Sequence, residues 1–120
     1  RIYRGRMRPE FGDRTAALVA GFHNSLTILS SEIEGRTYGG GVLELVPSEI
    51  ARLLVPLAPI EGELARLDEV CRRAGGQRDA SDVLIDATDA LLSQELPALR
   101  QILPEFRAAR NPLRQRRFRD

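Results

Sequence analysis

Apolar positions along this 120-residue chain recur mostly at helical spacing, with one short alternating run between them. The longest helical pattern covers residues 14–34. Its apolar stripe has intervals of three and four and consists of Val19, Phe22, Leu26, Leu29 and Ile33. Gly21 and the polar residues 23–25 interrupt the pattern, so we expect a break there, with Asn24-Ser25 as the N-cap pair of a second helix. Gly35 then stands where a helix C-cap glycine belongs.

The alternating run at residues 42–46 predicts a strand, and a strand needs a partner for its backbone groups. The first candidate is segment 1–7, where arginines alternate with apolar or neutral residues. The second is a strand formed by residues outside this chain. After residue 46, prolines at 47, 56 and 59 bound a short helix over 48–54, and 55–60 reads as a linker.

Three further helices are predicted in the second half of the chain. The first covers 61–74, buries Leu64, Leu67, Val70 and the small core residue Cys71, and ends at Gly75-Gly76. The second covers about 82–93 and is capped by Asp79 or Ser81. Its expected buried side consists of Leu84, Ala87, Thr88, Leu91 and Leu92. The third starts at Pro97 and is kinked at Pro104, and a basic end of mixed helix and coil follows it.

Three helical stripes against two strand-like runs predict an α+β fold that is predominantly α-helical, with four to five helices and one small sheet. We divide the chain into residues 1–56, which hold the central helix, glycine and strand pattern, and residues 57–120, a helical region with an Arg-rich end. No apolar run approaches the ~20 residues that span a bilayer, so no membrane association is expected.

Charge is uneven along the chain although the net charge is only +1. Residues 61–95 carry 4 Arg against 9 acidic residues, and residues 96–120 carry 7 Arg against 2. All 18 basic residues are Arg, a bias that either reflects a GC-rich genome or suits forked contacts with phosphate and guanine. The single cysteine excludes an internal disulfide and a cysteine-based zinc site, which is typical of a reducing, cytoplasmic location.

The region from residue 22 to 56 resembles the C-terminal part of bacterial adenine-specific DNA methyltransferases of restriction–modification systems. The resemblance is carried by Asn24-Ser25, Glu34-Gly35-Arg36, Tyr38-Gly39-Gly40-Gly41-Val42-Leu43-Glu44-Leu45, Pro47-Ser48-Glu49 and Val55-Pro56. It is weaker over 57–120. The family's catalytic motifs are absent: no glycine-bearing strand–helix turn for S-adenosylmethionine occurs, and Asn111-Pro112-Leu113 lacks the second proline and the aromatic residue of the adenine-gripping loop.

The resemblance implies a DNA-binding, target-recognition fragment that is inactive alone and holds no cofactor. It implies that S-adenosylmethionine belongs to a catalytic domain outside this chain. The implied partners are double-stranded DNA, that N-terminal catalytic domain and a restriction subunit. The residues expected to contact DNA are Asn24, Ser25, Arg36, Tyr38, Gly39, Gly40, Gly41, Arg114, Arg116 and Arg117.

Several alternatives stay open at this point. Tyr38 and the glycines form either a DNA contact or a tight architectural crossing from helix to strand. The acidic helices of 61–95 suit docking of another subunit, which defines a protein-interaction module as the alternative function. His23 and the stripe Asp79, Asp82, Asp86 and Asp89 favour structural or solvated roles over metal binding, and no metal site is expected.

Overall fold

The computed structural model describes residues 3–37, 41–76 and 80–119. Within these residues the α-helices are α1 (Thr15–Gly21), α2 (Ser25–Glu34), α3 (Pro47–Ile50), α4 (Leu64–Ala74), α5 (Ala80–Glu95) and α6 (Leu103–Arg119). Short 3-10 helices cover Pro9–Arg14, Glu61–Glu63 and Pro97–Leu99. Strands β1 (Arg36–Thr37) and β2 (Leu43–Glu44) pair in antiparallel fashion. The predicted predominantly helical α+β class is confirmed.

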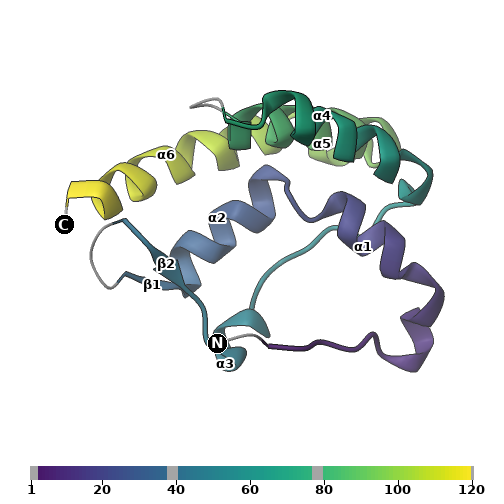
Figure 1. Cartoon of the computed structure of the whole chain (residues 1–120), viewed down its shortest axis with the longest axis horizontal. Coiled ribbons are helices and arrows are strands. Elements are labelled where there is room, and N and C mark those ends of the chain that lie inside the picture. The colour runs from purple at the N-terminus through teal and green to yellow at the C-terminus, as the bar shows by residue number, and fades with distance from the viewer. Residues whose placement is uncertain (1–2, 38–40, 77–79, 120) are drawn as a thin grey trace.

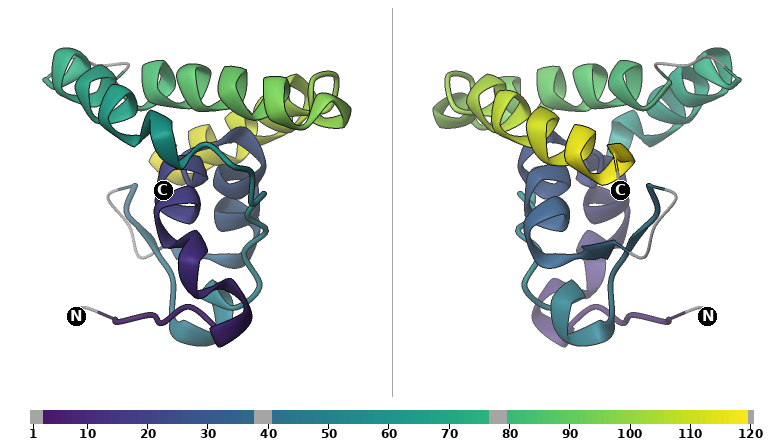
Figure 2. Two further views of the ribbon diagram at one scale, coloured as in Figure 1. Left: turned by 90° about the vertical axis from the view of Figure 1, so that its right-hand side faces the viewer. Right: turned by 90° about the vertical axis from the view of Figure 1, so that its left-hand side faces the viewer.

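The helices form two layers. Helices α4, α5 and α6 lie together along the top of the molecule in Figure 1, and α1 and α2 lie beneath them. The views along the long axis show the same stacking, with α3 and the N-terminal segment farthest from the upper layer (Figure 2). No helix in the described part of the chain is long and apolar enough to span a membrane.

The predicted break in the 14–34 pattern is confirmed, because α1 ends at Gly21 and α2 begins at Ser25. The side chain of Asn24 accepts a hydrogen bond from the Thr27 backbone N–H at 3.0 Å, which confirms it as the N-cap. The three non-helical residues shift the helical phase, so the predicted stripe does not occupy one face. Val19 and Ile33, at its two ends, are exposed.

Helix α2 uses its polar residues to bind the coil over residues 51–60. The Thr27 hydroxyl donates to the Leu54 carbonyl at 2.8 Å, and the Leu54 N–H donates to the Ser30 hydroxyl oxygen at 3.2 Å. Residues 51–54 were predicted as the end of a short helix, but that helix, α3, ends at Ile50. Residues 55–60, predicted as a linker, are packed against the fold, and Ala58 and Ile60 are buried.

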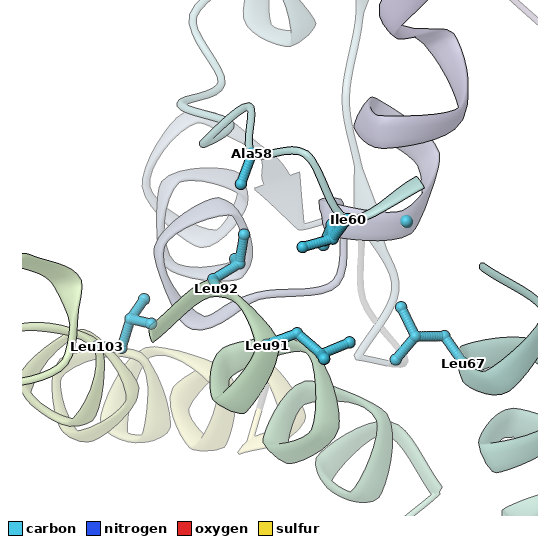
Figure 3. Packing of buried hydrophobic residues seen from close by; sticks show 7 residues of the cluster. Ala58, Ile60, Leu67, Leu91, Leu92 and Leu103 are labelled. Carbon is cyan, nitrogen blue, oxygen red and sulfur yellow. The ribbon is translucent and has the colours of Figure 1, made fainter. Parts of the chain in front are cut away.

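The hydrophobic core lies between the two layers. It consists of Ala20, Ala58, Ile60, Leu67, Leu91, Leu92 and Leu103. Figure 3 shows Leu91 and Leu92 of α5 at its centre, with Leu67, Leu103 and the coil residues around them. The core thus takes residues from both sides of the predicted division at residue 56. That division itself remains a prediction.

The expected strand pairing is wrong. The described residues of segment 1–7 form no strand, and the partner of β2 is β1, only a few residues earlier in the chain. Arg36 pairs with Glu44 and Thr37 with Leu43. A strand of two residues is too short to show an alternating pattern, so the sequence could not reveal it. Residues 1 and 2 lie outside the described residues.

Helix α4 ends as predicted, with Gly75 as its C-cap and Gly76 at a φ of 83°. The prediction that Cys71 is a core residue is wrong, because its side chain is exposed. The buried line of α4 runs through Leu67 and Ala74 and leaves Cys71 on its flank. Of the two predicted caps of the next helix, Asp79 lies outside the described residues, and Ser81 lies inside α5 and is not its cap.

The Arg-rich end differs from the expected mixture of helix and coil, because α6 is helical from Leu103 to Arg119. Pro97 begins a separate 3-10 turn. Pro104 falls in the first turn of α6, where its missing N–H costs no helical hydrogen bond, so it does not kink the helix as predicted. Pro112 lies inside α6 and removes one helical hydrogen bond, but the backbone stays helical to Arg119, so the basic residues sit on one helix.

Candidate nucleic-acid interface

The crossing from α2 into the hairpin depends on close backbone approach at Gly35. A Cβ atom at Gly35 would lie 2.7 Å from Leu43 Cδ1 and 2.8 Å from the Ser31 carbonyl oxygen. Gly35 is the C-cap of α2, as predicted, but its φ of −78° is open to any residue. The Ser31 backbone carbonyl, together with the Leu43 side chain, leaves no room for a side chain here, and a left-handed conformation is not the reason for the glycine.

Gly41 is the described member of the glycine triplet, and it packs against α6. Its φ is 78°, a conformation that favours glycine, and an added Cβ would overlap the Phe118 ring. Gly41 is also buried. This glycine thus has an architectural role in seating the turn on α6. Tyr38, Gly39 and Gly40 lie outside the described residues, so their DNA contacts remain predictions.

Arg36 is fixed at the start of the hairpin by a buried carboxylate. Its Nε lies 2.7 Å from Glu49 Oε1; the Arg36 side chain is 65% exposed, and that of Glu49 is 3% exposed. The other oxygen of Glu49 accepts from the Val46 N–H at 3.2 Å, which holds the carboxylate at the first turn of α3. The Nε of Arg36 is therefore held in place while most of its side chain is exposed. A directional contact requires this arrangement.

Asn24 and Ser25 lie inside the fold, with exposures of 0% and 2%. Asn24 Nδ2 donates to the Gly21 carbonyl and to Thr27 Oγ1, each at 2.7 Å. The Ser25 N–H and hydroxyl donate to the two carboxylate oxygens of Asp89 at 2.9 and 2.6 Å. Their polar groups are thus used within the protein, which favours architectural roles for them. A DNA contact by either side chain remains an untested prediction.

The Arg-rich end separates into distinct groups in space. Arg107 pairs with Asp86 and, at 3.5 Å, with Asp82, which also lies 3.6 Å from Arg110. Arg110 is buried, burial lowers the pKa of its guanidinium, and its Nε has no hydrogen-bond partner among the described residues. These two arginines hold α6 against α5 and are not available to an external anion.

Arg117 joins α6 to both α2 and the glycine turn. Its Nη2 and Nε bind the two carboxylate oxygens of Glu32 at 2.5 and 3.1 Å, and its Nη1 donates to the Gly41 carbonyl. Exposure is 13% for the Arg117 side chain and 4% for that of Glu32. Such a forked, buried ion pair positions the helix end. The role predicted for Arg117, a contact to phosphate, would compete with this pair.

Arg114 and Arg116 form no ion pair with any described residue, and Arg116 is exposed. The guanidinium of Arg114 lies 5.1 Å from the centre of the Phe118 ring, and that of Arg117 lies 5.2 Å from it. Phe118 was not among the predicted contact residues. Its spacing of four from Arg114 would have predicted the pairing once the end was known to be helical.

A small polar cavity separates the hairpin from α6. Its volume is about 160 Å³, and its lining includes Gly35, Thr37, Leu43 and Arg116. Sites for cofactor-sized ligands measure roughly 300–1,000 Å³. The cavity formed by the described residues is therefore smaller than such a site.

The other candidate groups have structural partners. Asp82 and Asp86 face arginines, and Asp89 binds Ser25. Desolvation lowers the pKa of His23, whose ring meets that of Phe22 edge-on at 6.0 Å. No group of three His, Cys, Asp or Glu residues suited to a metal ion occurs in the described ranges.

Comparisons with known proteins identify the family. Neither the curated proteins nor the solved structures searched contain a match to this chain. The family described as "Type II methyltransferase M.Eco57I, C-terminal domain" matches residues 1–92, which is most of the chain and includes the hairpin crossing. The chain therefore belongs to the family of Type II methyltransferase C-terminal domains represented by M.Eco57I.

Proposed function

We propose that this chain is the DNA-binding, target-recognition part of an adenine-specific DNA methyltransferase. One observation carries the proposal: the hairpin crossing and the basic end form one continuous edge. The Arg117–Gly41 hydrogen bond joins positions 76 residues apart, and Phe118 seats against the same glycine. In Figure 1 the β1–β2 hairpin lies beside the C-terminal end of α6.

Different residues of this edge have different roles in the proposal. Arg114 and Arg116 contact phosphate, because both are cations without an ion-pair partner in the described part of the chain. Arg36 reads a base edge, since Glu49 fixes its Nε while most of its side chain is exposed. Arg117 positions the edge through Glu32 and does not itself bind DNA.

S-adenosylmethionine and the target adenine are assigned to a catalytic domain outside this chain. The absence of the family's cofactor-binding turn from the sequence and the small volume of the cavity beside the hairpin support this assignment. The same proposal includes a cytoplasmic location and two protein partners, the N-terminal catalytic domain and a restriction subunit. We expect the chain alone neither to bind S-adenosylmethionine nor to methylate DNA.

Salt dependence of duplex binding tests the proposal. Each phosphate contact contributes about 0.9 to the slope of log K against log salt, so Arg114→Ala with Arg116→Ala should flatten the slope by about 2. The measurement is fluorescence anisotropy with labelled duplex at several salt concentrations. Arg66→Ala is the matched control, because this exposed arginine pairs with Glu63, close by in sequence, and with no other described residue. Binding without salt dependence, or no binding at all, would refute the proposed function.

Arg36→Ala tests base recognition separately within the same titrations. If Arg36 forks onto a guanine, its replacement should weaken binding by about 1–3 kcal/mol on the recognised sequence and by much less on random DNA. Equal losses on both sequences would identify a phosphate contact instead. If affinity is unchanged and only the melting temperature falls, the pair with Glu49 is architectural.

A protein-interaction module is the second candidate, and one observation favours it. An apolar groove of about 430 Å³ is lined by Leu26, Leu54, Val55, Pro56, Leu96, Ala98 and Leu99. The acidic helices present fewer unpaired carboxylates to a partner than their charge suggests. Five of their acidic residues pair with arginines: Glu63, Asp68, Glu69, Asp82 and Asp86. Under this candidate Leu54→Asp abolishes association with a restriction subunit, and duplex DNA binds without a salt-dependent slope.

A further inference from the structure

We propose that Phe118 is an aromatic contact that stacks on an unpaired or distorted base in the bound DNA. The inference rests on the proposed function and adds a non-ionic element to it. Phe118 is 59% exposed at the end of α6, directly beside the arginines assigned to phosphate. Exposed single apolar residues are ordinary, so the argument depends on what holds this ring and what surrounds it.

The ring is held in place by contacts with the glycine turn and with Arg117. Gly41 offers bare, buried backbone against which the ring packs, and a side chain at that position could not coexist with it. Arg117, itself fixed by Glu32, lies 5.2 Å from the ring centre. A ring supported by backbone and a buried ion pair is preorganised, which lowers the ordering cost of binding.

The surroundings of the ring suit a nucleotide. A guanidinium stacked on a ring uses its flat face and leaves its N–H edge for phosphate oxygens. Val42, the residue after Gly41, is also an exposed apolar residue. Arg114 and Arg116, the nearby arginines that form no ion pair with a described residue, leave uncompensated positive charge at this helix end, so charge complementarity favours a polyanion over an ordinary apolar protein surface. Among polyanions, nucleic acid also supplies flat apolar faces beside its phosphates.

Stacking and phosphate contacts differ in salt dependence. A neutral ring releases no counterions, so Phe118→Ala should leave the salt slope unchanged while it lowers affinity. The loss should be about 5- to 150-fold for a duplex that contains one unpaired adenine, and smaller for the fully paired duplex. Val19→Ala, which removes an equally exposed apolar side chain from α1, should change neither affinity nor slope.

A tryptophan reporter tests the contact directly and guards against misfolding. The chain contains no Trp, so Phe118→Trp places a single indole at the proposed site. We expect this variant to bind as tightly as the original chain and its emission to be quenched by the duplex with an unpaired adenine. Val19→Trp is the matched control and should show no quenching.

The outcomes separate the two proposals. If the chain does not bind DNA in a salt-dependent manner, the proposed function fails and this inference fails with it. If binding is steeply salt-dependent, the inference alone is refuted by a folded Phe118→Ala variant that keeps full affinity for the unpaired adenine. Unquenched emission from the bound Phe118→Trp variant would refute it equally.

Discussion

A half-buried carboxylate of α5 links that helix to the start of α2. Asp89 accepts two hydrogen bonds from Ser25, at the first residue of α2, and so supplies an acceptor for a helix N-terminus from another element. Asn24 supplies a second acceptor, because its side-chain oxygen accepts from the Thr27 backbone N–H. The polar residues around the helix break are therefore explained by the first backbone N–H groups of α2, which have no acceptor within the helix.

Removing Asp89 should destabilise the protein. Asp89→Ala leaves the Ser25 N–H without its acceptor in a largely buried position, and we expect a loss of about 1–3 kcal/mol in the free energy of unfolding. Chemical denaturation followed by circular dichroism measures it. Asp86→Ala on the same helix is the control, since Asp86 is mostly exposed and its ion pair with Arg107 should contribute less than about 1 kcal/mol.

The same carboxyl predicts a pH dependence. Burial raises the pKa of Asp89 above its ordinary value of 3.8, and the hydrogen bonds from Ser25 oppose this rise only in part. The folded state then holds the proton more tightly than the unfolded state. The stability contributed by protonated Asp89 is fully present below pH 3.8 and is lost as the pH rises through the folded pKa.

Asp89→Asn removes this titration while it keeps a side-chain oxygen for the Ser25 N–H. The free energy of unfolding of the Asn variant, relative to the original chain, should therefore increase as the pH rises from below 3.8 towards neutrality. Denaturation curves across that range provide the comparison. A difference that is independent of pH would show that Asp89 ionises as easily in the folded protein as in the unfolded chain.

Among the elements, α2 and α6 form the most extensive contact in the described part of the chain. The pair Arg117–Glu32 lies at the end of this contact nearest the hairpin and binds both helices and the Gly41 carbonyl. The DNA-facing edge of the proposed function thus depends on an ion pair, Arg117–Glu32, that contacts no DNA in the proposal.

Replacing one partner of the Arg117–Glu32 pair should destabilise the protein more than replacing both partners. Arg117→Met leaves the Glu32 carboxylate buried and uncompensated, which should lower the free energy of unfolding by about 3 kcal/mol, the lower end of the range for buried pairs. Arg117→Met combined with Glu32→Met should be less destabilised than the sum of the two single variants. A double-mutant cycle by chemical denaturation measures the coupling. Strictly additive effects would mean that the pair is effectively solvated.

Sequence patterns predicted where helices begin and end better than they predicted which residues are buried and which strands pair. The cap at Asn24 and the stop at Gly75 follow from local backbone chemistry, and both are confirmed. The exposure of Cys71 and the pairing of β2 with β1 depend on neighbours distant in sequence or on strands too short to show a period.

The candidate interface shows the same limit. The sequence indicated both the glycine crossing and the Arg-rich end, but it could not show that they meet. Nor could it show which arginines are already neutralised, because the partners of Arg107 and Arg117 lie on α5 and α2. Phe118 was missed because a lone aromatic residue among arginines has no spacing signal until the end is known to be helical.

At the scale of the whole molecule, the two predicted regions share one core. Leu92 of α5 is completely buried, and the same cluster contains Ala20 of α1 and Ala58 of the coil. Polar contacts add to this connection, since Asp89 of α5 caps α2. Because few contacts cross the boundary between independent domains, a shared core predicts that residues 1–56 and 57–120 unfold together.

Leu92→Ala tests this cooperativity. Truncation of a buried leucine should cost about 2–5 kcal/mol in the free energy of unfolding. Because α1 and α2 pack against the same core, native-state hydrogen exchange should show reduced protection of α2 amides as well as α5 amides, by similar amounts. Val19→Ala, at an exposed position of α1, should leave both sets of amides unchanged. If α5 loses protection while α2 keeps it, the two regions open separately. The basic end of α6 and the hairpin could then form the proposed DNA-binding edge only when both regions are folded at once.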